Sequence, residues 1–239
     1  MVPESRASLR LAEASALAAV PGLVHGFEQR LGPNGWETRE EGRGRVAAAL
    51  EPQGRLFLLR QVHGASVRVA PWQGTPDGDA AVAGEPGLLL GIETADCLPV
   101  LLVDPVLRRV AAAHAGWRGS AAGVTAAALW ALVERGSRPE DLLAALGPAI
   151  GPCCYEVGEE LRAAFGPQGA SFFRPGPRGR PHLDVRAVNE RQLLALGLRP
   201  ERLVHVADCT HCQADRYHSY RRDGRGAGRM ISFVGFAAA

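Results

Sequence analysis

Residues 87–119 read GLLLGIETADCLPVLLVDPVLRRVAAAHAGWRG, and the rest of the chain is organised around this stretch. Two apolar runs, 88–92 and 98–103, stand between turn residues and are typical of buried strands. Residues 109–113 predict a short returning strand. The stretch therefore predicts several adjacent strands at the centre of the fold.

Two chemically capable residues stand at the ends of these strands. Cys97 falls at the bend before one strand, and His114 falls where the next one ends and a helix begins. A thiol and an imidazole at adjacent strand ends have the geometry that a nucleophile–base pair or a metal site needs. A small cysteine packed in the core is the structural alternative.

Outside this stretch, predicted strands and helices alternate irregularly, with hairpin-like strand pairs as well as crossovers. This order favours an α+β class, a layered sandwich of mixed β-sheets with flanking helices, over a doubly wound parallel fold. No linker or repeat divides residues 1–239, so we predict a single domain. The other predicted strands are 23–27 at an edge, 55–62, 65–70, 142–146, 203–206 and 229–236. The predicted helices are 9–19, 120–136 with Ser120 as its cap, 158–165 and 186–196, and the predicted loops include 32–44, 71–79 and 165–181.

Composition excludes several classes of function. All 27 basic residues are arginines, and the absence of lysine excludes a Schiff-base lysine, a P-loop lysine and a Ser-Lys dyad. A net charge of +2 gives no reason to expect nucleic acid as a partner. No signal peptide and no run of 18 apolar residues is visible, so we expect a cytoplasmic protein without a membrane partner. The five cysteines are irregularly spaced, and we expect them to be reduced.

A third residue joins Cys97 and His114 as a candidate ligand. His63 ends the apolar run RLFLLRQVH, beside a glycine. Two imidazoles and one thiolate are suitable ligands for Zn²⁺, and three protein ligands leave a fourth position open, as catalytic zinc requires. The same trio suits copper. Because 34 residues separate His63 from Cys97, spacing alone leaves open whether they share a site.

Six motifs in one order resemble a known family. They are QVHG, TADCLPVLLVDP, AAHAGWRG, LGPAIGPCCYEVG, HLDV and SYRRDGRGAGRM, and the match covers about residues 55–236. They resemble the YfiH-like "laccase domain" family, also known as polyphenol oxidase and as purine nucleoside phosphorylase. The resemblance implies the single-domain fold shared with Cys-His deamidase toxins. It also implies that His63, Cys97 and His114 bind zinc as the catalytic centre.

The resemblance implies particular substrates as well. These are small-molecule purine nucleosides and phosphate, with phosphorolysis of adenosine, inosine and methylthioadenosine to the base and ribose 1-phosphate. Adenosine deamination is the implied side activity. Residues 1–54 depart from the family pattern, because the segment GPNGWETREEGRGR is short and lacks the expected elements. We expect them to be a divergent N-terminal part of the same domain.

Three arginines are candidates for binding phosphate. Arg221 and Arg222 lie in the arginine-rich stretch RYHSYRRDGRGAGR, where an anion-binding turn and a solvated loop are equally consistent with the sequence. Arg118 follows His114 at a predicted helix start, where backbone N–H groups favour anions.

The remaining cysteines have weaker signals. Cys209 and Cys212 form a CxxC, which is half of a zinc site or a redox pair, but no second CxxC completes it. We expect a structural role for this pair. Cys153 and Cys154 are adjacent, and we expect them to pack rather than react.

A zinc-dependent purine nucleoside enzyme is the preferred prediction. The alternatives are a metal-free hydrolase or deamidase in which His114 activates Cys97, a copper-dependent polyphenol oxidase, and a metal-binding protein without enzymatic activity. Multicopper oxidation generally requires more histidines than the seven present. The oligomeric state stays open.

Overall fold

A computed structural model describes residues 9–31, 38–177 and 179–238 of the chain. Strand β7 (Leu98–Asp104) is buried along its whole length. Its side chains alternate, so that Val100 and Leu102 pack with one apolar cluster and Leu101 and Val103 with another. A strand that is apolar on both faces requires a covering layer on each side, and this requirement determines the layers of the molecule.

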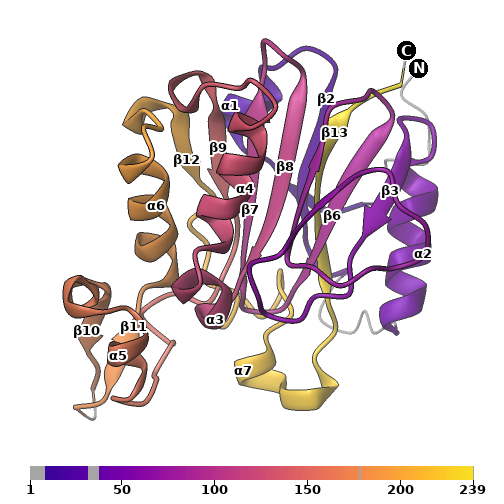
Figure 1. The fold of residues 1–239 in the computed structure, drawn as a ribbon. Coiled ribbons are helices and arrows are strands. Elements are labelled where there is room, and N and C mark those ends of the chain that lie inside the picture. The colour runs from indigo at the N-terminus through magenta and orange to yellow at the C-terminus, as the bar shows by residue number, and fades with distance from the viewer. Residues whose placement is uncertain (1–8, 32–37, 178, 239) are drawn as a thin grey trace.

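Two mixed sheets form the middle of the molecule (Figure 1). The six-stranded sheet has the order β12-β9-β7-β8-β5-β4, and the five-stranded sheet has the order β1-β2-β13-β6-β3. Most neighbours are antiparallel, while β12–β9, β4–β5 and β3–β6 are parallel. The strands of the first sheet besides β7 are β4 (Val67–Val69), β5 (Ala80–Ala83), β8 (Arg109–Ala115), β9 (Leu143–Leu146) and β12 (Leu203–His205). The strands of the second are β1 (Leu11–Ala12), β2 (Leu23–Glu28), β3 (Arg55–Leu58), β6 (Leu88–Thr94) and β13 (Met230–Phe236).

Helices cover the outer faces of both sheets. The six-stranded sheet packs against α4 (Val124–Val133) and α6 (Val185–Ala195), with α3 (Trp117–Ala121) beside them. The outer face of the five-stranded sheet packs against α2 (Arg39–Leu50) through Val46 and Leu50. The order of layers is therefore helix, sheet, sheet, helix, and the expected α+β class is confirmed (Figure 1). The short helices are α1 (Ser15–Ala18), α5 (Leu161–Ala164) and α7 (Tyr220–Asp223), and β10 (Phe173–Pro175) and β11 (Pro181–Leu183) form a separate hairpin.

The N-terminal predictions were the least accurate. Residues 9–19 were predicted as one helix, but they contain the short strand β1 and a single turn of helix. Residues 32–44 were predicted as a loop; 32–37 lie outside the described residues, and 39–44 belong to α2. Residues 23–27 do form a strand, but it pairs on both sides, with β1 and β13, so it is not an edge.

The long helix predicted over residues 120–136 is two helices. Gly123 has a left-handed backbone (φ 80°), which ends α3 and starts α4. Ser120 lies inside α3 rather than capping a helix. Residues 165–181 were predicted as a loop, but they include a 3₁₀ turn, strand β10 and the start of β11.

Candidate metal centre

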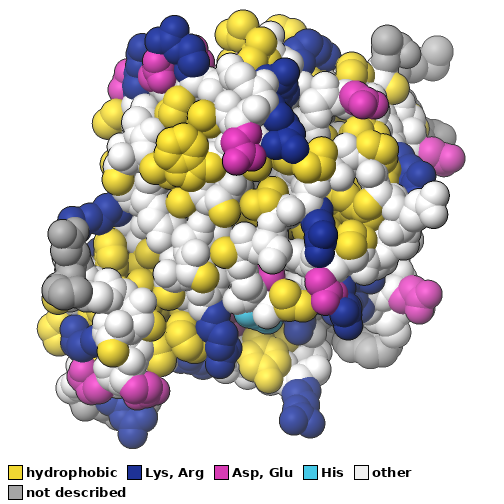
Figure 2. Space-filling model, viewed as in Figure 1, with side chains coloured by type: hydrophobic (Ala, Val, Ile, Leu, Met, Phe, Trp, Pro, Cys, Tyr) yellow, Lys and Arg dark blue, Asp and Glu magenta, His cyan; other side chains and the backbone are white. Residues whose placement is uncertain are grey.

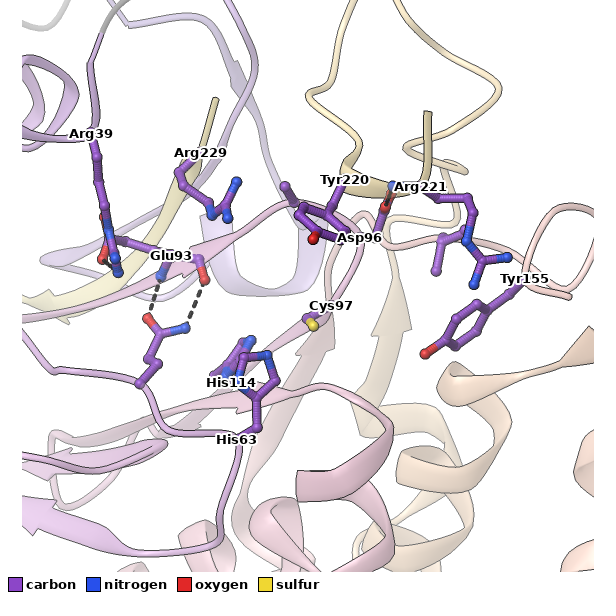
Figure 3. Close-up of a pocket in the computed structure, with 13 residues that line it drawn as sticks. Arg39, His63, Glu93, Asp96, Cys97, His114, Tyr155, Tyr220, Arg221 and Arg229 are labelled. Carbon is purple, nitrogen blue, oxygen red and sulfur yellow. Dashed lines mark hydrogen bonds and ion pairs between the residues drawn. The ribbon is translucent and has the colours of Figure 1, made fainter. Parts of the chain in front are cut away.

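His63, Cys97 and His114 lie together at one end of the two sheets (Figure 3). Their ligand atoms all lie within 4.8 Å of one another, and the two imidazole rings are 4.8 Å apart between centroids. His63 follows β3, Cys97 lies in the bend between β6 and β7, and His114 lies inside β8. Sequence analysis placed His114 just after its strand; the strand instead continues to Ala115.

Backbone geometry at two positions directs these side chains. His63 itself and Asp96, the residue before Cys97, both have left-handed backbones (φ 63° and 86°), which non-glycine residues adopt rarely. Such conformations persist only where surrounding contacts hold them. At Asp96 the carboxylate accepts hydrogen bonds from the Thr210 hydroxyl at 2.6 Å and the Arg221 backbone N–H at 2.6 Å.

Asp79 holds the loop that carries His63 and also orients His114. Its buried carboxylate accepts backbone N–H groups from His63 at 2.9 Å and Gly64 at 2.7 Å, and it lies 2.8 Å from His114 Nδ1. An ionised carboxylate only accepts, so Nδ1 of His114 carries the proton and Nε2 is left for a ligand. Carboxylates in this position orient metal-binding histidines. Sequence analysis placed Asp79 in a turn cluster and gave it no role.

The electrostatics of the trio favour a thiolate. Burial disfavours ionisation of Cys97, but His114 and His63 outweigh it and lower its pKa to about 6. Burial likewise opposes the charged form of His114, but the Cys97 thiolate and Asp79 raise its pKa to about 9. Ionised thiolate is the form of cysteine that binds metals and attacks electrophiles.

The trio lies at the base of a cavity of about 440 Å³. In the view of Figure 2, histidine atoms come to the surface among arginine and acidic side chains. Glu93 is buried in the wall, where Arg39 donates to it at 2.8 Å and 2.5 Å. The side chain of Gln61 makes two hydrogen bonds with the backbone of Glu93, at 2.7 Å and 2.8 Å (Figure 3). The other lining residues are Ala95, Asp96, Ile150, Tyr155, Tyr220, Arg221 and Arg229.

The three arginines predicted to bind phosphate occupy different places in the structure. Arg221 lines the cavity, with its guanidinium 5.2 Å from the ring of Tyr155. Arg222 is not among the lining residues, and its guanidinium donates to the carbonyls of Thr210, His211 and Tyr217. Arg118 stacks on Trp117 at 4.4 Å. Arg229, which sequence analysis did not propose, lines the cavity instead.

A His₂Cys set with an orienting carboxylate, at the base of a cavity in a layered α+β fold, is typical of an enzyme with a metal centre. A family model described as "Multi-copper polyphenol oxidoreductase laccase" matches residues 37–237. The chain belongs to this family, whose solved members include proteins named YfiH. The resemblance found in the sequence is thereby confirmed, and the match begins before residue 55.

Known relatives are similar over most of the chain. Purine nucleoside phosphorylase SCO2081 of Streptomyces coelicolor is 45% identical over 75% of this chain and 74% of its own length. Purine nucleoside phosphorylase YlmD of Geobacillus stearothermophilus is 35% identical over 97% and 95%. Adenosine deaminase RL5, from an unknown prokaryotic organism, is 35% identical over 65% and 61%. The crystal structure of Bacillus licheniformis hypothetical protein YfiH has a TM-score of 0.83 at 26% identity and covers 96% of each chain.

No helix among the described residues is long and apolar enough to cross a membrane.

Proposed function

We propose that the chain is a zinc-dependent purine nucleoside phosphorylase with adenosine deamination as a side activity. The observation that carries this proposal is the convergence of His63, Cys97 and His114 at the base of a cavity of about 440 Å³. The names of the relatives support the choice of nucleosides over phenols.

The trio fits a metal ion. Two imidazoles and a thiolate of lowered pKa converge within 4.8 Å. Because Nδ1 of His114 is hydrogen-bonded to Asp79, Nε2 is the ring nitrogen left to bind a metal ion. His63, Cys97 and His114 would hold zinc, which supplies Lewis acidity beside the reacting centre when bound. Copper accepts the same ligands. A multicopper centre needs further histidines, and the other metal-capable cluster in the described part of the chain consists of cysteines.

The arginines of the cavity would position phosphate. In phosphorolysis a phosphate oxygen forms a bond to the ribose anomeric carbon, the bond from that carbon to the purine nitrogen breaks, and the purine leaves with the bonding electron pair and takes up a proton. Arg221 and Arg229 line the cavity and offer fixed positive charge to the phosphate. The product is ribose 1-phosphate.

Two tyrosines would bind the nucleoside. Tyr155 and Tyr220 both line the cavity, and their ring faces offer surfaces on which a purine stacks. Burial, followed by the charge of Cys97, raises the pKa of Tyr155 well above its usual value. Its hydroxyl therefore stays protonated and donates hydrogen bonds to the substrate.

The test is turnover of inosine with and without phosphate, and of adenosine without phosphate, by protein of measured zinc content. We expect phosphate-dependent release of hypoxanthine and slower, phosphate-independent conversion of adenosine to inosine. Arg221→Ala should raise the KM for phosphate while sparing deamination, whereas the control Arg225→Ala, in an exposed part of the same segment, should change neither. Equal losses of both activities in Arg221→Ala would make this arginine structural, and no turnover of either nucleoside by zinc-loaded protein would refute the proposal.

A second candidate function is supported by the spatial arrangement in which Cys97 lies beside His114 and His114 lies beside Asp79. This arrangement of thiol, imidazole and carboxylate also suits a cysteine hydrolase or deamidase. The two functions exclude each other, because a thiolate bound to zinc is not a free nucleophile. In the zinc enzyme, iodoacetamide should label Cys97 slowly until a chelator removes the metal, and added Zn²⁺ should restore activity to unlabelled protein. Rapid labelling of Cys97 in zinc-loaded protein, with parallel loss of turnover, would favour the hydrolase; peptide mapping locates the label.

A further inference from the structure

Four cysteines gather at a second place in the molecule. Cys153 and Cys154 follow strand β9, and Cys209 and Cys212 follow strand β12. These two strands are parallel neighbours, so both loops leave the sheet at the same end. An isolated parallel β-bridge between the backbones of Ala149 and Cys209 continues the strand pairing into the loops. The fold thus brings together two pairs that are more than 50 residues apart.

The sulfur atoms have the spacing of a metal site. All four Sγ atoms lie within 4.8 Å of one another, with Cys212 at 3.3 Å from Cys154 and 3.7 Å from Cys153. A zinc ion with four Zn–S bonds of about 2.3 Å places its sulfurs about 3.8 Å apart. A disulfide needs about 2.05 Å between sulfurs, which is much shorter than either contact. Cys153 and Cys154 were expected to pack rather than react; in the structure both sulfur atoms lie against that of Cys212.

The surroundings complement a thiolate cluster. The backbone N–H of Gly151 donates to Cys209 Sγ at 3.2 Å, a contact that stabilises a sulfur ligand. Zinc with four thiolates carries two negative charges. Two arginines reach these loops from helices α6 and α7. Arg221 donates to the carbonyl of Cys154 at 3.4 Å, and Arg186 donates to the carbonyl of Asp208, next to Cys209, at 3.4 Å.

We propose that Cys153, Cys154, Cys209 and Cys212 bind a structural zinc ion, separate from the His63–Cys97–His114 centre. Four protein ligands close the coordination shell, so this ion would take no substrate. It would instead join the loop that carries Tyr155 to the segment that leads to Tyr220 and Arg221. One wall of the cavity is therefore expected to depend on the four-cysteine site.

The test uses protein that lacks the first centre. The triple variant His63→Ala, Cys97→Ser, His114→Ala keeps all four cysteines, and elemental analysis after dialysis against a weak chelator should find about one zinc per chain. The wild type should hold about two. X-ray absorption of the triple variant should show a shell of sulfur alone at about 2.3 Å. Adding Cys212→Ser should remove this zinc and lower the Tm.

If the quadruple variant does not fold, Cys212→His in the same background provides a second measurement. Histidine keeps a ligand at this position, so the zinc should remain while one sulfur of the shell is replaced by nitrogen. A folded triple variant without zinc, or one whose mass is lower by two hydrogens because a disulfide has formed, would overturn the proposal. Neither result would depend on nucleoside turnover, so the proposed function is tested separately.

Discussion

At the scale of single residues, Asp79 is the side chain on which the trio most depends. Its carboxylate lies 2.8 Å from His114 Nδ1 and accepts backbone N–H groups of the loop that carries His63. A carboxylate behind a metal-binding histidine fixes the ring and increases its basicity. Replacing Asp79 should therefore weaken metal binding even though Asp79 is not a predicted ligand.

Asp79→Asn should weaken zinc binding by about 10–100-fold. The amide keeps the size of the side chain but loses the charge that supports His114. The measurement is competition for zinc with a chromophoric chelator. Asp77→Asn is the control, because Asp77 pairs with exposed Arg60, and its zinc affinity should equal that of the wild type. Unchanged affinity in Asp79→Asn would show that the carboxylate only holds the loop.

Labelling of Cys97 in metal-free protein should depend on pH with a midpoint near 6. His114 and His63 outweigh burial and lower the pKa of this thiol to about 6, so the reactive thiolate persists above that pH and is lost as the pH falls through it. His114→Ala removes the larger favourable charge, and the midpoint should move up toward the ordinary value of about 8.5. Rates of iodoacetamide labelling, followed by peptide mapping, test both points. A midpoint unmoved by His114→Ala would contradict this account.

The three residues of the trio can be identified from the sequence, but the side chains that position them cannot. His63, Cys97 and His114 were visible because each lies at or near the end of an apolar strand. Asp79 was missed because its contacts with His63 and His114 span 16 and 35 residues, and only the register of the sheet brings them together. The metal-binding roles of the trio stay a prediction.

At the scale of elements, the turn from β8 into α3 must pass very close to the trio. A Cβ at Gly116 would lie 2.9 Å from Cys97 Sγ and 3.3 Å from His63 Cδ2. Its backbone angles suit any residue (φ −70°), so space and not conformation requires glycine here.

Gly116→Ala should therefore displace Cys97 or His63 and reduce both zinc occupancy and turnover, by up to about 100-fold in turnover. Gly226→Ala is the matched control, because its added Cβ would meet nothing within 4 Å. Zinc content and kcat/KM of the two variants give the comparison. Full zinc occupancy in Gly116→Ala would mean that the backbone of the turn shifts to make room for the added methyl group without moving Cys97 or His63.

The elements that were mispredicted have identifiable causes. The first part of helix α2, residues 39–44, contains two glycines and was predicted as a loop, although Thr38 and Glu41 form a capping box that marks the start of the helix. Residues 120–136 were predicted as one helix because alanines on both sides of Gly123 favour helix, although the left-handed backbone of Gly123 separates α3 from α4. The strands of the central stretch were predicted well, since burial on both faces gives them uninterrupted apolar sequences.

At the scale of the whole molecule, stability depends on the layer between the two sheets. Leu101 of β7 is fully buried there, packed with residues of the five-stranded sheet such as Phe27 and Ile92. The α+β sandwich followed from the irregular order of elements. The pairing of β13 between β2 and β6 did not, because nothing local in residues 230–236 shows which strands they join. That the chain is one domain stays a prediction.

Leu101→Ala should lower the free energy of unfolding by about 2–5 kcal/mol, through lost burial and the cavity left behind. Val106→Ala, at a position that is 77% exposed, should change it by no more than about 0.5 kcal/mol. Urea denaturation monitored by tryptophan fluorescence gives both values. A loss below about 1 kcal/mol in Leu101→Ala would mean that the sheets close over the gap.

The position of β13 also has a consequence for synthesis. A ribosome delivers the strands in chain order, but the five-stranded sheet has its latest strand in the middle, paired with β2 on one side and β6 on the other. Until Met230–Phe236 has emerged, these two strands have no partner between them, and the unpaired backbone N–H and C=O groups along their facing edges stay open to other nascent chains. Tyr220 and Arg221, which complete the cavity, emerge only shortly before. A nascent chain halted before residue 220 is thus expected to carry His63, Cys97 and His114 without a finished cavity.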